Sequence, residues 1–285
     1  MEPGRPSATA EGAALLRAAH QLFDVPTVLD DPVVLRLLGP EHEARLRAHP
    51  AAFDERDRRP LRAAIAARSR FAEDCLRDAV ARGVGQYVVL GAGLDSFAYR
   101  NPFPPETLRV FEVDHPDTQA WKRSRLAAAG IPLPTSLTFV PVDFEHGTLA
   151  DALAAHGFDA TRPTFVSWLG VTVYLTREAV WETLGWVGSL PAGSEIVFTY
   201  LPDPSSLDRA SHAALDALGA HVAAGGEPWR TFFAPDELAR GLAERGFGRV
   251  EDLGPEAIFA RWFRGRADGL RPGGSVHFVR ATRTG

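Results

Sequence analysis

A glycine turn at the end of an apolar run is the feature of this sequence that most directly suggests ligand chemistry. Val88–Arg100 (VVLGAGLDSFAYR) passes from strand-like residues into Gly91-Ala92-Gly93. Glycines there let a ligand approach the main chain with no Cβ in the way. A dinucleotide-binding fingerprint would place a third glycine three residues on, whereas this chain continues with Leu94-Asp95-Ser96-Phe97. The turn therefore predicts a ligand held without a pyrophosphate. Asp95 would receive an ammonium group of that ligand or cap the segment that follows.

Acids follow the next two apolar runs. Asp114, in FEVDHP, stands about 20 residues beyond the glycine turn, the offset at which a carboxylate accepts hydrogen bonds from ribose hydroxyls. It is better placed than Glu112, although it would also serve to cap the helix that Pro116 begins. His115 is expected to cap that turn rather than act as a base.

A third acid would complete an adenosine site. Asp143, in VPVDF, would accept from an adenine amino group, and the main-chain N–H of Phe144 would donate to a ring nitrogen. Residues 167–176, which include Leu169, offer an apolar and aromatic wall that suits either an adenine ring or a packed core. Adenosine with a zwitterionic tail describes S-adenosylmethionine (SAM) better than NAD.

The pattern of elements predicts how these residues are positioned. From about Glu11 to Arg82 the chain reads as helices punctuated by prolines. After Gly83, short apolar runs alternate with helices, which indicates a doubly wound α/β sheet, mostly parallel and closed by an antiparallel strand. We expect seven strands within 86–91, 107–114, 136–143, 163–170, 194–201, 247–254 and 274–282, and helices near 116–129, 149–156, 177–189 and 235–245.

Two regions are expected: a helical cap over residues 1–82 and a Rossmann-like core over 83–285, with a lid-like insert at about 202–233. The insert combines an amphipathic helix with glycines and aromatic residues, which suits a lid that excludes water. Glu227 and Trp229 are its candidate substrate-side residues, with simple packing on the core as the alternative. Tyr200 is the third candidate for a catalytic role, and no catalytic residue is assigned.

Composition excludes several classes of function. The 285 residues carry a net charge of −5, so no basic field favours nucleic acid or an anionic membrane surface. No apolar run approaches the roughly 20 residues that span a bilayer. The single cysteine, Cys75, is expected to be buried on a helix, and a cytoplasmic protein without a metal site is the simplest account. No feature of the sequence indicates an oligomeric state.

Several segments together resemble the leucine carboxyl methyltransferase superfamily of class I SAM-dependent methyltransferases, and in particular its bacterial, actinobacterial-rich branch. VLGAGLDSFAYR and FEVDHP are the specific ones, and the resemblance covers nearly the whole chain. The supporting segments are TVLDDPVVLRLLGP, ARSRFAED, FVPVDF, the Tyr-Leu pair of VTVYLT, GEPWRTFF and LARGLAERGF.

The resemblance implies roles for single residues. Arg68 would grip the SAM carboxylate, with Arg70 as the neighbour that could be confused with it. Gly91 and Gly93 would form the methionine-side turn, Asp114 would bind the ribose, and Asp143 with Phe144 the adenine. Many relatives carry a glutamate before the Tyr-Leu pair, where this chain has Leu169 and Gly170, so a SAM contact there would be main chain.

The function implied is O-methylation of a carboxyl or hydroxyl group of a small-molecule secondary metabolite. A carboxylate acceptor is already ionised and needs no general base, whereas a hydroxyl usually does. The alternatives are an NAD(P)-dependent oxidoreductase and a SAM-binding protein that transfers no methyl group.

Overall fold

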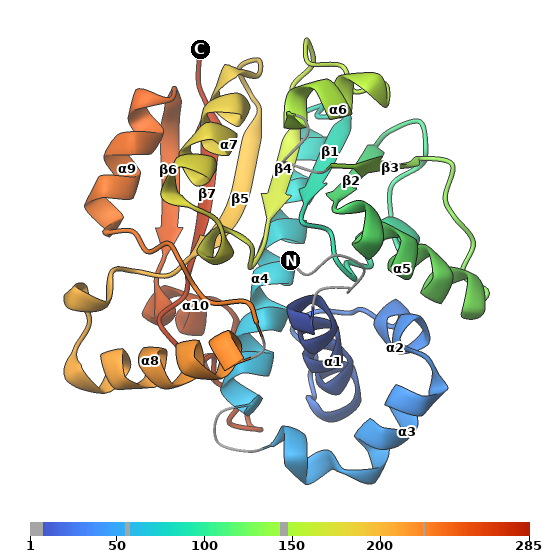
Figure 1. Ribbon diagram of the computed structural model, residues 1–285, viewed down its shortest axis with the longest axis vertical. Helices are drawn as coiled ribbons and strands as arrows, with labels where there is room; N and C mark the ends of the chain where they lie inside the picture. Colours follow the sequence, from blue (N-terminus) through green and yellow to red (C-terminus); the bar gives the residue numbers. More distant parts are fainter. Residues whose placement is uncertain (1–7, 55–57, 143–147, 225) are drawn as a thin grey trace.

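A seven-stranded sheet forms the centre of the molecule, for which the computed structural model describes residues 8–54, 58–142, 148–224 and 226–285. The strand order is β3-β2-β1-β4-β5-β7-β6, and β7 runs antiparallel to both of its neighbours (Figure 1). The order reverses between β1 and β4, so the ends of these strands mark the switch point where open α/β sheets bind ligands. The predicted doubly wound, mostly parallel sheet is confirmed. The strands are β1 (Gln86–Leu90), β2 (Arg109–Asp114), β3 (Leu137–Pro141), β4 (Phe165–Trp168), β5 (Glu195–Tyr200), β6 (Phe247–Leu253) and β7 (His277–Arg283).

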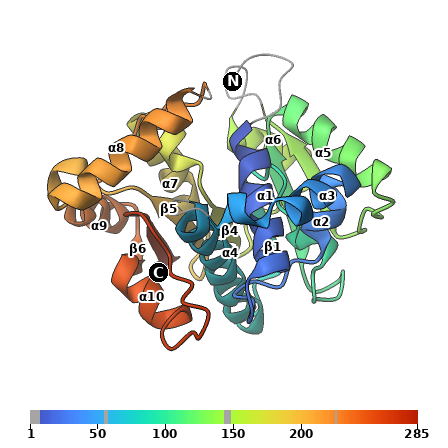
Figure 2. The same ribbon diagram turned by 90° about the horizontal axis from the view of Figure 1, so that it is seen from below.

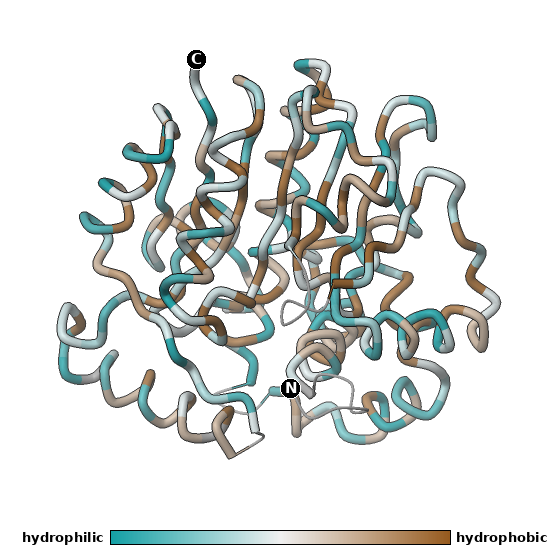
Figure 3. Tube along the Cα trace, turned by 45° about the horizontal axis from the view of Figure 1, so that its top comes forward, coloured by the Kyte–Doolittle hydropathy of each residue, from teal (hydrophilic) through white to brown (hydrophobic). Residues whose placement is uncertain are grey.

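Helices cover both faces of this sheet because the central strands are apolar on both sides, with β1, β4 and β5 fully buried. One core cluster joins the strands to α4 (Arg58–Ala81) and α10 (Pro255–Trp262). The other joins them to α6 (Leu149–Ala155), α7 (Arg177–Ser189) and α9 (Pro235–Glu244). Hydrophobic residues accordingly concentrate along the strands (Figure 3). Helix α5 (Pro116–Ala128) follows β2, and all four helices expected between strands are confirmed.

Four helices precede the first strand, as expected. They are α1 (Ala8–Phe23), α2 (Val33–Leu38), α3 (Pro40–Ala48) and α4, with a short 3-10 segment, η1 (Pro50–Phe53), before α4. Helices α1 to α3 lie together on one side of α4 and share a core cluster with Ile65 of α4 and Leu126 of α5 (Figure 2). The same α4 supplies Phe71 and Leu76 to the sheet. This helix therefore ties the N-terminal helices to the strand ends.

The segment after β5 forms a closed excursion from the sheet. It contains η4 (Pro204–Ser206) and α8 (Arg209–Ala224), and an isolated parallel bridge between Pro202 and Phe233 joins its two ends. Helices α8 and α1 both lie beyond the edge at which the parallel strands end (Figure 1). Within the described residues, no helix combines the length and the apolar composition that crossing a bilayer would take.

Candidate functional site

The glycine turn follows β1 directly and is tightly enclosed. Gly91 and Gly93 have φ values of 63° and 47°, a region that disfavours residues with a Cβ. A Cβ on Gly91 would stand 2.5 Å from Cγ2 of Val171, in the loop after β4, and one on Gly93 would stand 3.0 Å from the Cβ of Ala10 on α1. The turn is therefore held between the switch-point loop and the first helix, and it tolerates no larger residue.

Asp114 ends β2 and is bonded to this turn. Its Oδ2 accepts from the Gly93 amide at 2.5 Å, and its Oδ1 accepts from the His115 amide at 2.7 Å. Burial raises the pKa of Asp114, although these two backbone donors act in the opposite direction. The cap of α5 is His115, whose Nδ1 accepts from the Asp117 amide at 3.2 Å. The carboxylate therefore faces the turn, where a ligand's hydroxyls would meet it, and it does not serve as the helix cap.

Arg68, on α4, brings an unpaired positive charge to the same place. Burial lowers the pKa of Arg68 to about 10, and the positive charge of Arg17 adds to this. Among the described residues no side chain or carbonyl pairs with its guanidinium. Arg70 differs, because its Nε donates to Asp74 at 2.8 Å. Arg68 is half-buried, and a partly desolvated cation without a hydrogen-bond partner favours an anionic ligand beside it.

Other predicted residues have partners of their own. Oδ1 of Asp95 accepts from the Phe97 amide at 2.8 Å, so the capping alternative is observed, and an ammonium contact stays a prediction. Glu112 is buried, and its Oε2 lies 2.7 Å from Nζ of Lys122, so its carboxyl group is engaged with a lysine and not available to a ribose. Leu169 packs against the sheet core. Asp143 and Phe144 lie outside the described residues, so their predicted adenine contacts stay predictions.

The segment after α8 reaches the same region. Burial raises the pKa of the Tyr174 hydroxyl, and the charge of Glu227 raises it further. A hydrogen bond from Trp229 and the charge of Arg68 lower this pKa. Oε2 of Glu227 also accepts from the Thr9 amide of α1 at 3.3 Å. The structure thus brings Glu227 and Trp229 close to Arg68 through Tyr174. Tyr174 stands in the short segment η3 (Thr172–Tyr174).

Tyr200 has hydrogen-bond partners outside the group of residues described above, and its candidate catalytic role stays a prediction. Side chains alternate along β5, and Thr199 is the one on the site's side, where its Oγ1 accepts from the Gly170 amide at 2.8 Å. Tyr200 points to the opposite face, and its hydroxyl donates to Asp252 at 2.7 Å. Tyr200 is buried and Asp252 is exposed, and the contact between them suits a structural role for Tyr200.

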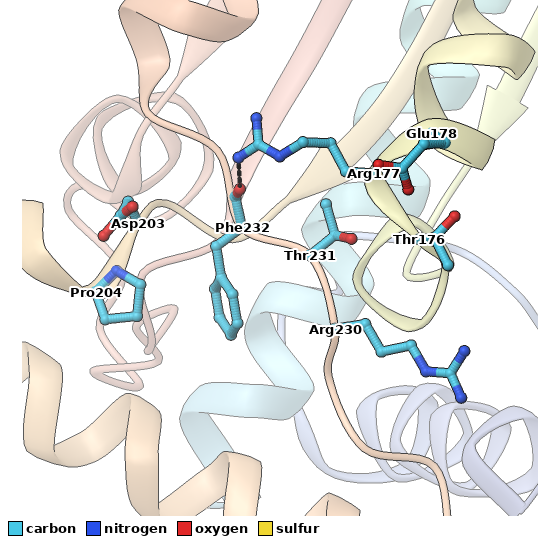
Figure 4. A pocket seen from close by; sticks show the side chains of 8 residues that line it. All are labelled: Thr176, Arg177, Glu178, Asp203, Pro204, Arg230, Thr231 and Phe232. Carbon is cyan, nitrogen blue, oxygen red and sulfur yellow. Dashed lines mark hydrogen bonds between the residues drawn. The ribbon is translucent and has the colours of Figure 1, made fainter.

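A surface pocket of about 450 Å³ opens beside the base of the excursion (Figure 4). It adjoins the site through the Arg230 amide, which donates to the Val173 carbonyl at 2.7 Å. Arg177 donates from Nη2 to the Phe232 carbonyl at 2.8 Å, whereas the side chain of Arg230 extends away from Phe232 (Figure 4). The pocket is lined by Thr176, Arg177, Glu178, Asp203, Pro204, Arg230, Thr231 and Phe232. In the part of the chain that the structure describes, no three His, Cys, Asp or Glu residues gather as a metal site would need.

Comparison with known proteins agrees with this geometry. A sequence profile described as leucine carboxyl methyltransferase matches residues 10–188. YktD of Bacillus subtilis, named for SAM-dependent methyl transfer, is 32% identical and covers 99% of this chain and 100% of its own length. A Mycobacterium marinum protein with the same kind of name is 39% identical over 70% of this chain and 67% of its own. The crystal structure of a protein from Thermobifida fusca, titled as a methyltransferase, superposes with a TM-score of 0.57 at 18% identity, covering 100% and 97% of the two chains. That likeness supports the fold.

Proposed function

The chain belongs to the leucine carboxyl methyltransferase family and uses SAM as its methyl donor, and we propose that it methylates an oxygen atom of a small-molecule acceptor, with a carboxylate as the first candidate. SAM supplies a sulfonium methyl carbon, to which the acceptor oxygen bonds as the carbon–sulfur bond breaks and its electron pair returns to sulfur. The NAD(P) alternative has no support from the relatives or from the turn, which lacks the third glycine.

We assign the ends of SAM to residues by the chemistry of each group. Arg68 binds the carboxylate, because its half-buried guanidinium has no hydrogen-bond partner in the described ranges. The main chain of Gly91–Gly93 lies along the methionine part, and Asp95 is the acid available to the ammonium group. Asp114, already bonded to the Gly93 amide, accepts from the ribose hydroxyls.

The choice of a carboxylate acceptor depends on the protonation of Tyr174. Burial raises the pKa of this hydroxyl, so at neutral pH it keeps its proton and cannot serve as a base. Glu227 is engaged at the first turn of α1, and no histidine stands among the described residues assigned to the site. A carboxylate needs no base, because no proton moves when its oxygen takes the methyl group.

The surroundings suit such a transfer on electrostatic grounds. An anionic acceptor and a sulfonium give a neutral ester and a neutral thioether, so charge disappears along the reaction. Such a reaction is favoured where water is excluded, because the charged reactants lose more solvation there than the transition state, in which the charge is dispersed. Leu169, Val171 and Trp229 contribute apolar surface here, and the contacts of the insert with Thr9 and Tyr174 cover the site. We therefore assign the acceptor to the side of Tyr174 and Trp229.

Labelled methyl transfer tests this proposal. The protein is incubated with methyl-labelled SAM and matched pairs of acceptors, each a carboxylic acid and the corresponding phenol or alcohol. We expect label in product that mild base hydrolyses to labelled methanol, as for a methyl ester. Label found only in base-stable product would establish a hydroxyl acceptor. Tight SAM binding with no transfer to any acceptor would favour the SAM-binding protein without methyl transfer.

The remaining assignments concern the cellular setting. We infer a secondary metabolite as the acceptor. A single cysteine, Cys75, which is buried and whose pKa burial raises to about 12, fits a reducing compartment. On that ground we place the reaction in the cytoplasm.

A further inference from the structure

A buried acid of the N-terminal helices stands directly behind the glycine turn. Asp31 is fully buried between α1 and α2, and its Oδ1 accepts from the Val34 amide at 3.2 Å. Two arginines approach it from different elements. Nε of Arg17, on α1, lies 3.3 Å from Oδ2, and Nε of Arg100 lies 3.3 Å from Oδ1. One carboxylate thus joins two guanidinium groups.

Both arginines also hold the segment that leaves the glycine turn. Nη2 of Arg17 donates to the carbonyl of Leu94 at 2.5 Å, one residue after Gly93. Arg100 closes the segment at its other end, where its Nη1 donates to Glu73 of α4 at 2.9 Å. The segment is therefore fixed at its beginning and its end by two arginines that share Asp31.

The same acid controls charge near the predicted carboxylate site. The charge of Arg17 lowers the pKa of Arg68, so the two guanidinium groups are close enough to repel. Asp31 offsets the charge of Arg17 through an ion pair that is not a hydrogen bond, and the attraction between the two buried charges holds the guanidinium where it reaches Leu94. Without this partner, Arg17 would be a buried charge free to turn from Leu94.

We propose that Asp31 is a positioning residue for the amino-acid end of SAM: it orients Arg17 and Arg100, and through them the turn beside Arg68. This rests on the proposed SAM site. Its effect is expected to be larger at the amino-acid end of the ligand, because Leu94 and Arg68 adjoin the methionine part, whereas Asp114, although bonded to Gly93, is also held by β2 and by the His115 amide. A residue that served stability alone would affect both ends of the ligand equally.

Two ligands separate these possibilities. S-adenosylhomocysteine carries the amino-acid tail, and 5′-methylthioadenosine lacks it. For Asp31→Asn we expect the Kd for S-adenosylhomocysteine to rise about tenfold or more, the size of effect seen when a residue that orients a binding group is lost. The Kd for methylthioadenosine should change less than about threefold. The matched control is Asp30→Asn, which removes a charge from the exposed neighbour and should leave both constants unchanged.

Calorimetry with the full chain gives both constants, measured well below each variant's Tm. Equal weakening of the two ligands, or none, would overturn the positioning role while leaving the SAM site intact. If Asp31→Asn does not fold, Arg17→Lys is the test of the positioning role. Arginine reaches Asp31 with Nε and the Leu94 carbonyl with Nη2, whereas lysine has a single nitrogen, so the same selective loss of affinity is expected. A wild-type protein that binds neither ligand would instead refute the SAM site itself, and this proposal with it.

Discussion

The guanidinium of Arg68 lies against the main chain of Gly170, two residues beyond β4. A Cβ placed on Gly170 would stand 2.9 Å from Cζ of Arg68, and the φ of 71° at this glycine also disfavours larger residues. The Gly170 amide is fixed in turn by Thr199. A glycine thus creates the space in which the half-buried guanidinium of Arg68 can face the ligand site from α4.

Replacing Gly170 by alanine should therefore displace the Arg68 side chain. We expect the Kd for S-adenosylhomocysteine to rise about tenfold or more, since a misplaced contact of about 1 Å has effects of this order. Calorimetry measures it. Gly130→Ala is a matched control, because Gly130 has a φ of 61° but no atom within 4 Å of its Cβ position. Both variants should lose stability of about 1 kcal/mol from backbone strain, and equal affinities in the two would contradict the role of Arg68.

Arg68→Met should separate binding from stability. Without ligand, this variant removes a half-buried charge that has no hydrogen-bond partner in the described residues, so we expect its Tm not to fall. Its affinity for S-adenosylhomocysteine should fall about 100-fold, because a carboxylate loses charge-assisted hydrogen bonds of about 1.5–3 kcal/mol. Thermal unfolding with and without ligand measures both. Arg70→Met, which breaks a half-exposed pair with Asp74, should leave the affinity unchanged. A fall in both Tm and affinity would indicate that Arg68 supports the fold.

Local pattern was sufficient to predict the elements that carry the site. The sheet, the glycine turn after β1 and the position of Asp114 each depend on residues close together in the sequence, through alternation, turn chemistry and strand ends. Helix α10, which lies between β6 and β7, was not predicted: it is a single short segment of eight residues, begun by Pro255, of which only Ile258 is buried.

Contacts between distant segments could not be predicted in the same way. Glu227 meets Thr9 across 218 residues, and no periodicity indicates that pairing. Arg17 lies on α1 and Asp31 in the loop before α2, and the pattern of neither segment indicates that the two side chains meet. Tyr200 follows Thr199 on β5, and alternation alone does not reveal which of the two faces the ligand site.

Asp114→Ala should abolish the stabilisation that ligands confer. SAM and S-adenosylhomocysteine are expected to raise the Tm of the wild-type protein and to leave that of the variant unchanged, because the ribose hydroxyls lose their acceptor. The ionised carboxylate is the form that accepts twice, and burial raises the pKa of Asp114. Wild-type affinity should consequently fall on acidification, starting at a pH above the ordinary range of this group. Asp117→Ala, three residues on in α5, is the control, and an equal Tm shift in wild type and Asp114→Ala would refute the ribose assignment.

Glu112→Gln should change the pH dependence of stability. Burial raises the pKa of Glu112 from an ordinary 4.5 to about 7, against the effect of Lys122, 2.7 Å away. The folded protein therefore keeps this proton over a pH range in which the unfolded chain loses it. The stability that the protonated Glu112 contributes is complete below pH 4.5 and is lost as pH rises through about 7. Between pH 5 and pH 8 the wild-type free energy of unfolding should fall by about 2–3 kcal/mol more than that of Glu112→Gln, as urea titrations would measure. Glu178→Gln, at an exposed position, should retain the wild-type slope, and the same slope in Glu112→Gln would show that the buried pair stays ionised throughout.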